Sequence, residues 1–139
     1  MKVFIDTNVL LDLMLDRPEF KNASASCIQG LRNHGAGLYI SSLTVIHAYY
    51  FLRKTHGHEK SMEITQSTLD MFHVLPSDAS TLQRSMSLHF NDLEDAHQCA
   101  IALQGNCDYL VTRDLKGFKK APLTILSPAE MLSHLQLKS

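Results

Sequence analysis

The sequence has few of the features that mark a secreted protein, a membrane protein or a protein that coats nucleic acid. Its three cysteines, Cys27, Cys99 and Cys107, lack the short paired spacing of a zinc site or a redox dithiol, so we expect reduced, buried thiols. Thirteen basic and fourteen acidic residues give a formal net charge of −1, which argues against phosphate binding through bulk positive charge. Any contact with nucleic acid must therefore be local.

Low-complexity linkers, internal repeats and long apolar runs are also missing. The apolar run near the N-terminus is interrupted by Asp6 and Asp12, so it makes neither a signal peptide nor a membrane-spanning helix. We therefore expect a cytoplasmic protein. A chain of 139 residues has room for one apolar core, so we also expect a single domain over residues 1–139.

What the sequence does have is an alternation of short apolar runs with helical stretches. Runs rich in β-branched and aromatic residues predict five strands, at 3–5, 38–40, 74–75, 109–112 and 123–126. Nearly all of these residues are apolar, so we expect an α/β fold with a parallel sheet of about five strands, each covered by helices on both faces. The helices are predicted near 7–15, 19–34, 42–57, 59–72, 79–89 and 92–104, and a last helix begins at the capping motif Ser127-Pro128-Ala129-Glu130.

Four acidic residues lie where such a fold could gather them. Asp6 follows the first predicted strand and Asp114 follows the fourth, and in open parallel sheets the ligand crevice lies beyond the carboxyl ends of the strands. Asp92 and Asp95 are three residues apart at a predicted helix start, so they share one face. Clustered carboxylates repel one another without a cation, and oxygen ligands suit Mg²⁺ or Mn²⁺, which commonly bridge phosphates. This pattern indicates phosphodiester hydrolysis by a metal-activated water.

Each acid also has a purely structural interpretation. Asp6 would cap the following helix through its side-chain oxygen, and Asp114 would shape a turn. Acids in a first helical turn, such as Asp95, are favoured by the helix dipole. Asn91 and Glu94 have the spacing of a capping box, which makes Glu94 a structural residue.

Other polar residues beside the acids are candidates for supporting roles. Thr7, Asn8 and Thr112 would hold the attacking water or a carboxylate by hydrogen bonds, or else serve as plain caps. Arg113 is next to the acid cluster, and its guanidinium fork would brace a phosphate.

Further basic and aromatic residues are open to two interpretations. Lys116, Lys119 and Lys120 follow Arg113 beside the predicted crevice, and we interpret Lys119 and Lys120 as ordinary solvated lysines. The aromatic run at 49–51 would either stack on bases or, as helical spacing favours, pack in the core or at a dimer interface.

Five segments resemble the successive blocks of a PIN domain, and the resemblance spans nearly the whole chain: FIDTNVLLDLML, ISSLTVIHAYYFLRK, NDLEDAHQCAIAL, YLVTRDLKGF and LSPAEML. The sequence is most similar to the small bacterial branch that includes the VapC-type toxins. The resemblance implies a three-layer α/β/α fold and metal-dependent endoribonuclease activity on single-stranded or structured RNA. It also implies homodimers, often with an antitoxin that occludes or disturbs the site.

The site residues that the resemblance implies are the same acids. By position, Asp6, Asp95 and Asp114 match the catalytic acids that hold Mg²⁺ or Mn²⁺ in the family. Asp92 matches an additional acid of the branch that writes this helix start as D-x-x-D-A.

His47 departs from the family pattern, because similar proteins usually carry a glutamate there. Three accounts of His47 compete: a metal ligand, which would favour Mn²⁺; a cationic contact to substrate phosphate; and a residue that only fills space. Gly117 also stands where similar proteins often place another acid. The rival interpretation is therefore a catalytically weakened PIN fold that binds RNA or a protein partner.

Overall fold

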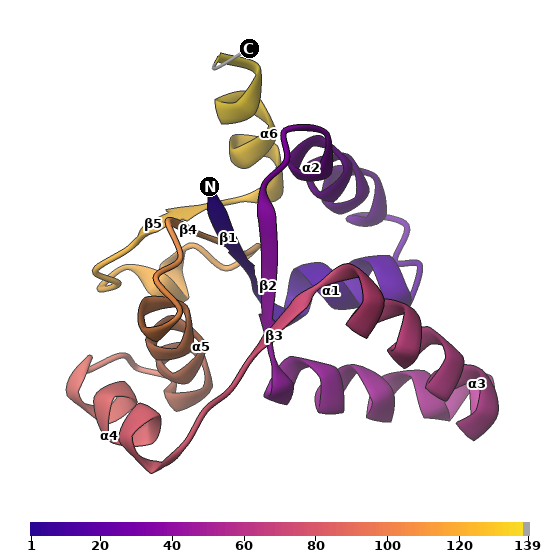
Figure 1. Ribbon diagram of the computed structural model, residues 1–139, viewed down its shortest axis with the longest axis horizontal. Coiled ribbons are helices and arrows are strands. Elements are labelled where there is room, and N and C mark those ends of the chain that lie inside the picture. Colours follow the sequence, from indigo (N-terminus) through magenta and orange to yellow (C-terminus); the bar gives the residue numbers. More distant parts are fainter. Residues whose placement is uncertain (138–139) are drawn as a thin grey trace.

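A computed structural model describes residues 1–137 and contains a five-stranded parallel sheet in the order β3-β2-β1-β4-β5 (Figure 1). The prediction of an α/β fold with a parallel sheet is confirmed. The strands are β1 (Lys2–Ile5), β2 (Gly37–Ser41), β3 (His73–Leu75), β4 (Tyr109–Val111) and β5 (Thr124–Leu126). The helices are α1 (Thr7–Met14), α2 (Lys21–Asn33), α3 (Ser42–Met71), α4 (Ala79–Ser87), α5 (Leu93–Gln104), the short 3₁₀ helix η1 (Lys116–Phe118) and α6 (Pro128–Leu137).

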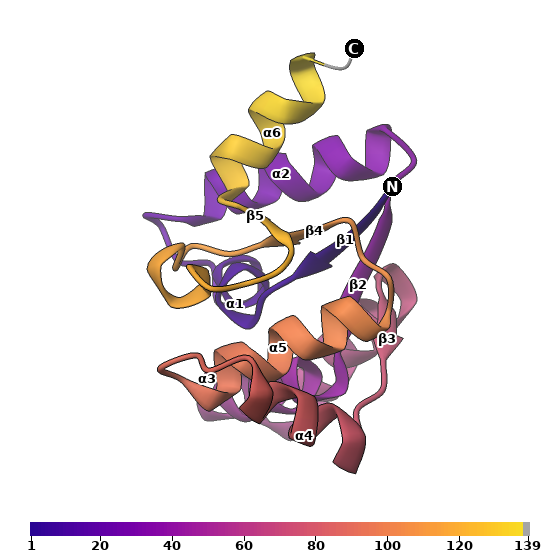
Figure 2. The same ribbon diagram turned by 90° about the vertical axis from the view of Figure 1, so that its left-hand side faces the viewer.

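Two apolar clusters cover the two faces of the sheet. Side chains of α1, α2 and α6, such as Leu10, Leu31 and Met131, pack on one face. On the other face, α5 and η1 contribute Ile101 and Phe118 to a second cluster. Figure 2 shows the sheet between α2 and α6 on one side and α5 with α4 on the other. The layered arrangement expected from the apolar strands is therefore present.

The expectation that every strand is covered on both faces is wrong for the two edge strands. Val3, Phe4 and Ile5 of the central strand β1 are fully buried, whereas Val74 of β3 is 38% exposed and Thr124 of β5 is exposed. An edge strand has a neighbour on one side only, and the covering helices pack over the middle of the sheet. Apolar composition alone therefore does not separate central strands from edges.

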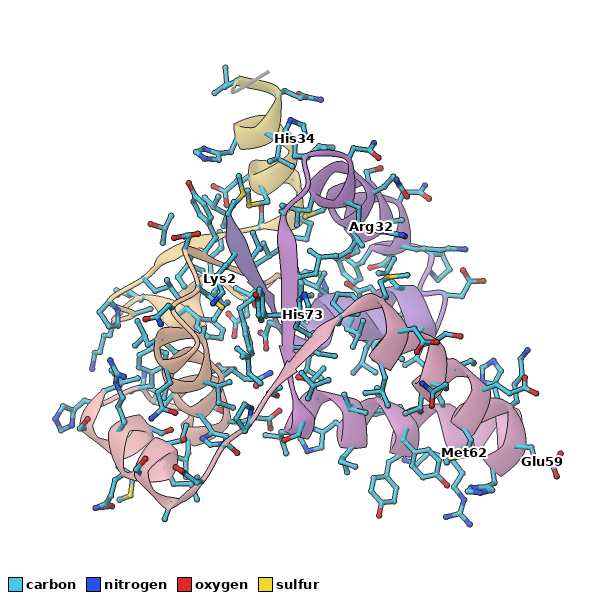
Figure 3. All side chains as sticks on the ribbon, viewed as in Figure 1. Lys2, Arg32, His34, Glu59, Met62 and His73 are labelled. Atoms are coloured by element: carbon cyan, nitrogen blue, oxygen red, sulfur yellow. The ribbon has the colours of Figure 1, made fainter. Side chains whose placement is uncertain are left out.

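Helix α3 contains an interruption that the sequence predicts. Gly57 has φ 77° and ψ 173°, a conformation that glycine adopts at little steric cost, and it separates the two helical segments expected on either side. The chain runs away from β2 and returns beyond Gly57 (Figure 1), and Glu59 and Met62 mark the far end of this excursion (Figure 3). Within residues 1–137, neither α3 nor another helix combines the length and apolar character needed to cross a membrane.

Smaller features also follow the sequence. The capping box that opens α6 is formed, because Glu130 N donates to Ser127 Oγ at 3.1 Å and Ser127 N donates to Glu130 Oε1 at 2.9 Å. All three cysteines are free and buried, as expected.

The strand order places a crevice at the carboxyl ends of β1 and β4. The chain builds outward from β1 to β2 and β3, and then crosses to β4 on the other side of β1. Such a reversal leaves a gap between the connections that leave the two neighbouring strands. Asp6 directly follows β1 and Thr112 directly follows β4, so the predicted acids of both segments meet at this point.

Candidate active site

Asp6 is held at the base of the crevice and is only 5% exposed. Its Oδ1 accepts a hydrogen bond of 2.8 Å from Thr7 N, which caps α1, and its Oδ2 accepts one of 2.8 Å from Thr112 Oγ1. Gln98 Nε2 adds a longer bond of 3.3 Å to Oδ1. Burial raises the pKa of Asp6 despite these bonds. Asp6 is therefore a helix cap and a member of the acid cluster at the same time.

Asp92 and Asp95 enter the crevice from the start of α5. Asp92 is the N-cap residue, and its Oδ1 accepts a bond of 3.0 Å from Asp95 N. The predicted capping box of Asn91 and Glu94 is wrong, because the helix begins one residue later than that box requires. Asp92 is the N-cap residue instead, and Asp95 is the residue whose backbone N–H it accepts.

The carboxyl group of Asp95 is the centre of the cluster. Its pKa is raised to about 7, first by burial and then by the charges of Asp6, Asp92, Asp114 and Glu94. Asp92 and Glu94 belong to the same helix start, whereas the fold brings Asp6 and Asp114 from distant segments close enough to disfavour ionisation of Asp95. The other three predicted acids therefore all lie near Asp95.

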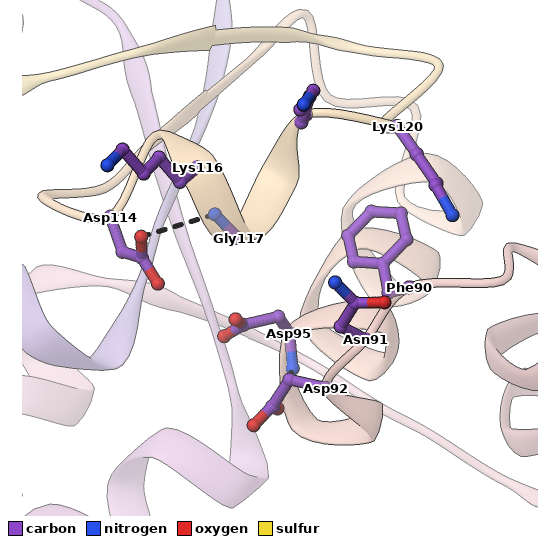
Figure 4. A pocket seen from close by; sticks show the side chains of 9 residues that line it. Phe90, Asn91, Asp92, Asp95, Asp114, Lys116, Gly117 and Lys120 are labelled. Carbon is purple, nitrogen blue, oxygen red and sulfur yellow. Dashed lines mark hydrogen bonds between the residues drawn. The ribbon is translucent and has the colours of Figure 1, made fainter.

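Asp114 is fixed by the turn that follows β4. Asp114 N donates to Thr112 Oγ1 at 3.1 Å, and Asp114 Oδ1 accepts a bond of 3.2 Å from Gly117 N (Figure 4). The point that a Cβ atom would occupy on Gly117 lies 2.7 Å from Oδ2 of Asp114 and 2.7 Å from Oδ2 of Asp95. Any larger residue at position 117 would therefore press on both carboxylates.

This arrangement fits a hard divalent cation. As the side chains stand within residues 1–137, no three histidine, cysteine, aspartate or glutamate side chains already surround a common point. Mg²⁺ does not need such a cage, because it is usually held by one or two carboxylates and keeps several waters. Asp95 and Asp114 face a shared gap, and their carboxylate oxygens are ligands that suit Mg²⁺ or Mn²⁺.

His47 lines a pocket of about 440 Å³, and Asp6 and Asp95 line the same pocket. His47 Nδ1 is 3.4 Å from Glu94 Oε1, and Glu94 lines the same pocket. The charge of Glu94 raises the pKa of both Asp6 and Asp95. Glu94 is therefore an additional acid of the site, whereas the sequence pattern indicated only a helix cap.

A PIN domain family profile matches residues 2–116. The chain belongs to the PIN domain family. Ribonuclease VapC1 of Aquifex aeolicus (strain VF5) is 25% identical to it over 134 residues, which cover 93% of this chain and 92% of that protein.

Solved structures agree with this PIN fold. The VapBC2 complex of Rickettsia felis, bound to a DNA fragment from its promoter, contains a chain that superposes with a TM-score of 0.72 at 18% identity, covering 91% of this chain and 98% of that one. A toxin-antitoxin complex from Klebsiella pneumoniae gives a TM-score of 0.71 at 25% identity, covering 92% and 98%.

Thr7, Asn8 and Thr112, predicted as supporting residues, form a hydrogen-bonded frame around the acids of this PIN domain. Thr112 Oγ1, besides its bond to Asp6, accepts a bond of 3.3 Å from Asn8 Nδ2, and Asn8 Oδ1 accepts one of 3.3 Å from Arg113 N. Thr7 Oγ1 lies 2.7 Å from Thr44 Oγ1. Thr7 and Thr112 contact Asp6 or Asp114 directly, and Asn8 supports Thr112, so the frame sets where these carboxylates lie.

Gln98 is a central member of this frame that the sequence reasoning missed. It is 1% exposed, its Nε2 lies 2.9 Å from the hydroxyls of both Thr7 and Thr44, and its Oε1 accepts a bond of 2.7 Å from Ser41 Oγ. The available signal was its position three residues after Asp95 among small and apolar neighbours. A polar residue at that spacing shares the helix face of the acid.

Arg113 does not present a free guanidinium to the crevice. Its Nε donates to Asp12 Oδ2 at 2.7 Å and its Nη2 donates to Asp12 Oδ1 at 3.2 Å, while the guanidinium carbon lies 3.8 Å from the centre of the Phe20 ring. Asp12 is completely buried. The predicted role of Arg113 as a phosphate contact is therefore not supported by this geometry, because its fork is already engaged by Asp12.

Proposed function

We propose that this PIN domain is a metal-dependent endoribonuclease that hydrolyses phosphodiester bonds in RNA. The observation that carries the proposal is the crowding around Asp95, whose pKa is raised to about 7 by burial and by four other carboxylates. An apo fold gains nothing from such crowding, because each further charge destabilises the ionised cluster. A divalent cation would relieve it. Asp6, Asp95 and Asp114 would hold the Mg²⁺ or Mn²⁺, with Asp92 assisting.

The chemistry follows from what the bound cation supplies, which is charge stabilisation at the phosphate and an activated water. The chain's own residues orient the acids that serve this purpose. Thr112 and Thr7 fix the carboxylate of Asp6, and the amide of Gly117 fixes that of Asp114. Loss of these donors would displace the carboxylates from their working positions.

His47 and Glu94 together suggest how the chain works without the usual glutamate at position 47. The carboxylate of Glu94 reaches the same pocket as His47 and lies 3.4 Å from its ring nitrogen. We assign to Glu94 the negative charge that similar proteins carry at position 47. His47 then serves as the partner that holds Glu94 in place or contacts the substrate.

We also propose a protein partner and a second copy of the chain. The similar structure from Klebsiella pneumoniae is a toxin-antitoxin complex, which supports an antitoxin that binds this chain as the toxin of a pair. Tyr50 and Phe51 of α3 are 58% and 45% exposed, so they do not pack in the core, and the neighbouring Ile46 is 54% exposed. This apolar face of α3 supports a homodimer.

The test is incubation of purified protein with single-stranded and hairpin RNAs in Mg²⁺, in Mn²⁺ and in chelator. We expect internal cleavage that needs the metal and that is lost in Asp6→Asn. The His47→Glu variant, run beside the wild type, shows whether histidine changes the metal preference of cleavage or lowers the cleavage activity. No cleavage by the wild type in either metal, on any of the RNAs, would contradict the proposal.

The second candidate function is a binding module with a weakened site. His47 and Gly117, which stand where similar proteins carry acids, are the residues that favour it. The two functions differ in their response to metal, because only a site that holds the ion gains thermal stability from it. If Mn²⁺ leaves Tm unchanged while RNA still binds, the binding module is the better description.

A further inference from the structure

A pocket of about 410 Å³ lies beside the acids, on the side away from His47. The loop before α5 and the η1 turn form its two walls, and Asp92, Asp95 and Asp114 line the part next to the candidate metal position (Figure 4). The rest of the lining is different in kind, since it combines lysines with an aromatic ring. A phosphate held at the acids would have this pocket directly next to it.

Lys116 and Lys119 give the pocket positive charge that is not used within the fold. Both side chains are exposed and line the pocket, and neither forms an ion pair with residues 1–137 despite the acids nearby. Lys120 has a different role, because its Nζ donates to the carbonyl of His89 at 3.0 Å and thereby ties the two walls together.

Phe90 gives the same pocket an aromatic surface. Its ring packs edge to face against Phe118, with centroids 5.9 Å apart, and Phe118 is 2% exposed in the second apolar cluster. Phe90 itself is only half-buried, so the part of the ring that does not touch Phe118 lines the pocket. A ring anchored in this way is a rigid surface on which a base can stack.

We propose that this pocket binds the nucleotide next to the scissile phosphate of a single RNA strand, with its base on Phe90 and its phosphate on Lys116 and Lys119. The inference rests on the proposed function for the identity of the strand, but binding in the pocket does not require cleavage. The pocket combines the two kinds of contact that proteins use to bind single strands without sequence preference, namely cationic side chains for the backbone and aromatic rings for the bases.

The test is the affinity for a fluorescein-labelled oligouridylate of about ten nucleotides, a length within the usual single-strand site sizes. Fluorescence anisotropy is followed in chelator and in Mn²⁺, over a series of salt concentrations. The variants are Lys116→Ala, Lys119→Ala and Phe90→Leu. Lys60→Ala is the control, because Lys60 is exposed, follows Glu59 in the part of α3 that lies far from the pocket (Figure 3), and pairs only with the exposed Glu63 at 3.6 Å.

We expect each of the two lysine variants to lower the slope of log affinity against log salt by about 0.7, the value for one phosphate contact on a single strand. Phe90→Leu keeps an apolar side chain against Phe118 but removes the stacking surface, so it should weaken binding about tenfold and leave the salt slope unchanged. Lys60→Ala should match the wild type. Melting temperatures of all variants establish that they are folded.

The outcomes separate this inference from the proposed function. If the wild type does not bind the strand, or if all three pocket variants bind like Lys60→Ala, the pocket is not a nucleotide site, whether or not the protein cleaves RNA. If binding depends on Phe90 and the lysines but no metal supports cleavage, the nucleotide site is established and the nuclease proposal fails.

Discussion

Two acidic residues of this PIN domain, Asp12 and Asp95, are withdrawn from water in opposite ways. Asp12 is completely buried and is matched by cations, since Arg113 binds both of its oxygens and Arg17 Nη1 lies 3.5 Å from Oδ1. Asp95 is half-buried and is surrounded by other carboxylates, which raise its pKa to about 7. The first arrangement stabilises the fold as it stands, and the second leaves a repulsion between carboxylates that the proposed cation would relieve. Pairing, rather than burial, thus separates the structural acid from the candidate functional one.

The largest effect is expected from breaking the structural pair. Asp12→Ala removes a fully buried carboxylate and leaves the partly exposed Arg113 and Arg17 without their partner, so it should lower the free energy of unfolding by about 3 kcal/mol. Urea denaturation measures this loss. Asp16→Asn is the control, because Asp16 pairs with Lys21 on the surface, an exposed pair contributes only about 0–1 kcal/mol, and asparagine tolerates the φ of 56° at this position. Equal losses in the two variants would remove the distinction between the acids.

A substitution at Asp95 is expected to raise the stability of the metal-free protein rather than lower it. Asp95→Asn removes a charge that the folded chain disfavours, so the metal-free variant should melt at a higher temperature than the metal-free wild type. The same substitution should abolish the gain in Tm from Mn²⁺, which is worth about 2.7 kcal/mol for a site with ligand at a hundred times its Kd. Differential scanning calorimetry with and without chelator reads both effects. A variant that still gains stability from Mn²⁺ would show that the ion binds elsewhere.

The pH dependence sharpens the comparison further. Because the pKa of Asp95 is raised from 3.8 to about 7, the folded chain holds a proton that the unfolded chain has lost, and the stability of the metal-free protein should fall as pH rises between these values. A metal competes with that proton, so its affinity should fall about tenfold for each pH unit below 7. Calorimetric titration with Mn²⁺ from pH 8 to about 5 checks this. An affinity independent of pH would mean that Asp95 is not a ligand.

The smallest effect is expected at Gly117. Gly117→Ala places a methyl group 2.7 Å from the oxygens of both Asp95 and Asp114, so the carboxylates must separate and the affinity for Mn²⁺ should fall by up to about tenfold, or about 1.4 kcal/mol. The backbone bond from residue 117 to Asp114 remains available, and the fold should be retained. Gly30→Ala is the control for metal binding, because Gly30 lies in α2 and a Cβ there would meet only the side chains of Leu132 and Leu135. Unchanged affinity would place the ion away from this gap.

Much of this architecture could be predicted from local patterns in the sequence. The strand segments, the Gly57 interruption and the position of Asp6, Asp92, Asp95 and Asp114 at strand ends and a helix start all follow from periodicity and connection rules. What could not be predicted depends on pairing between distant residues. Arg113 and Asp12 are 101 positions apart, and their contact changed the interpretation of Arg113 from substrate contact to anchor.

Other errors in the prediction have local causes. Helix α5 begins one residue later than a capping box of Asn91 and Glu94 requires. Asp92 is therefore the N-cap, and Glu94 lies in the pocket with His47. Helix boundaries are the least certain part of a sequence-based prediction, and here the boundary decided which acid faces the site. The hydrogen-bonding role of Gln98 was missed because its spacing from Asp95 shows a shared helix face but not the distant hydroxyls of Ser41 and Thr44 that it contacts.

The double role of Asp6 bears on the order in which folding and binding of the proposed cation would occur. Its carboxylate has three donors within the chain, from Thr7, Thr112 and Gln98, and it caps α1 through one of them. Removal of a cation by chelator therefore costs α1 no cap and leaves the frame of the crevice intact. On the proposed function, the chain would therefore fold before it binds the metal, and the ion could be withdrawn and restored without a cycle of unfolding.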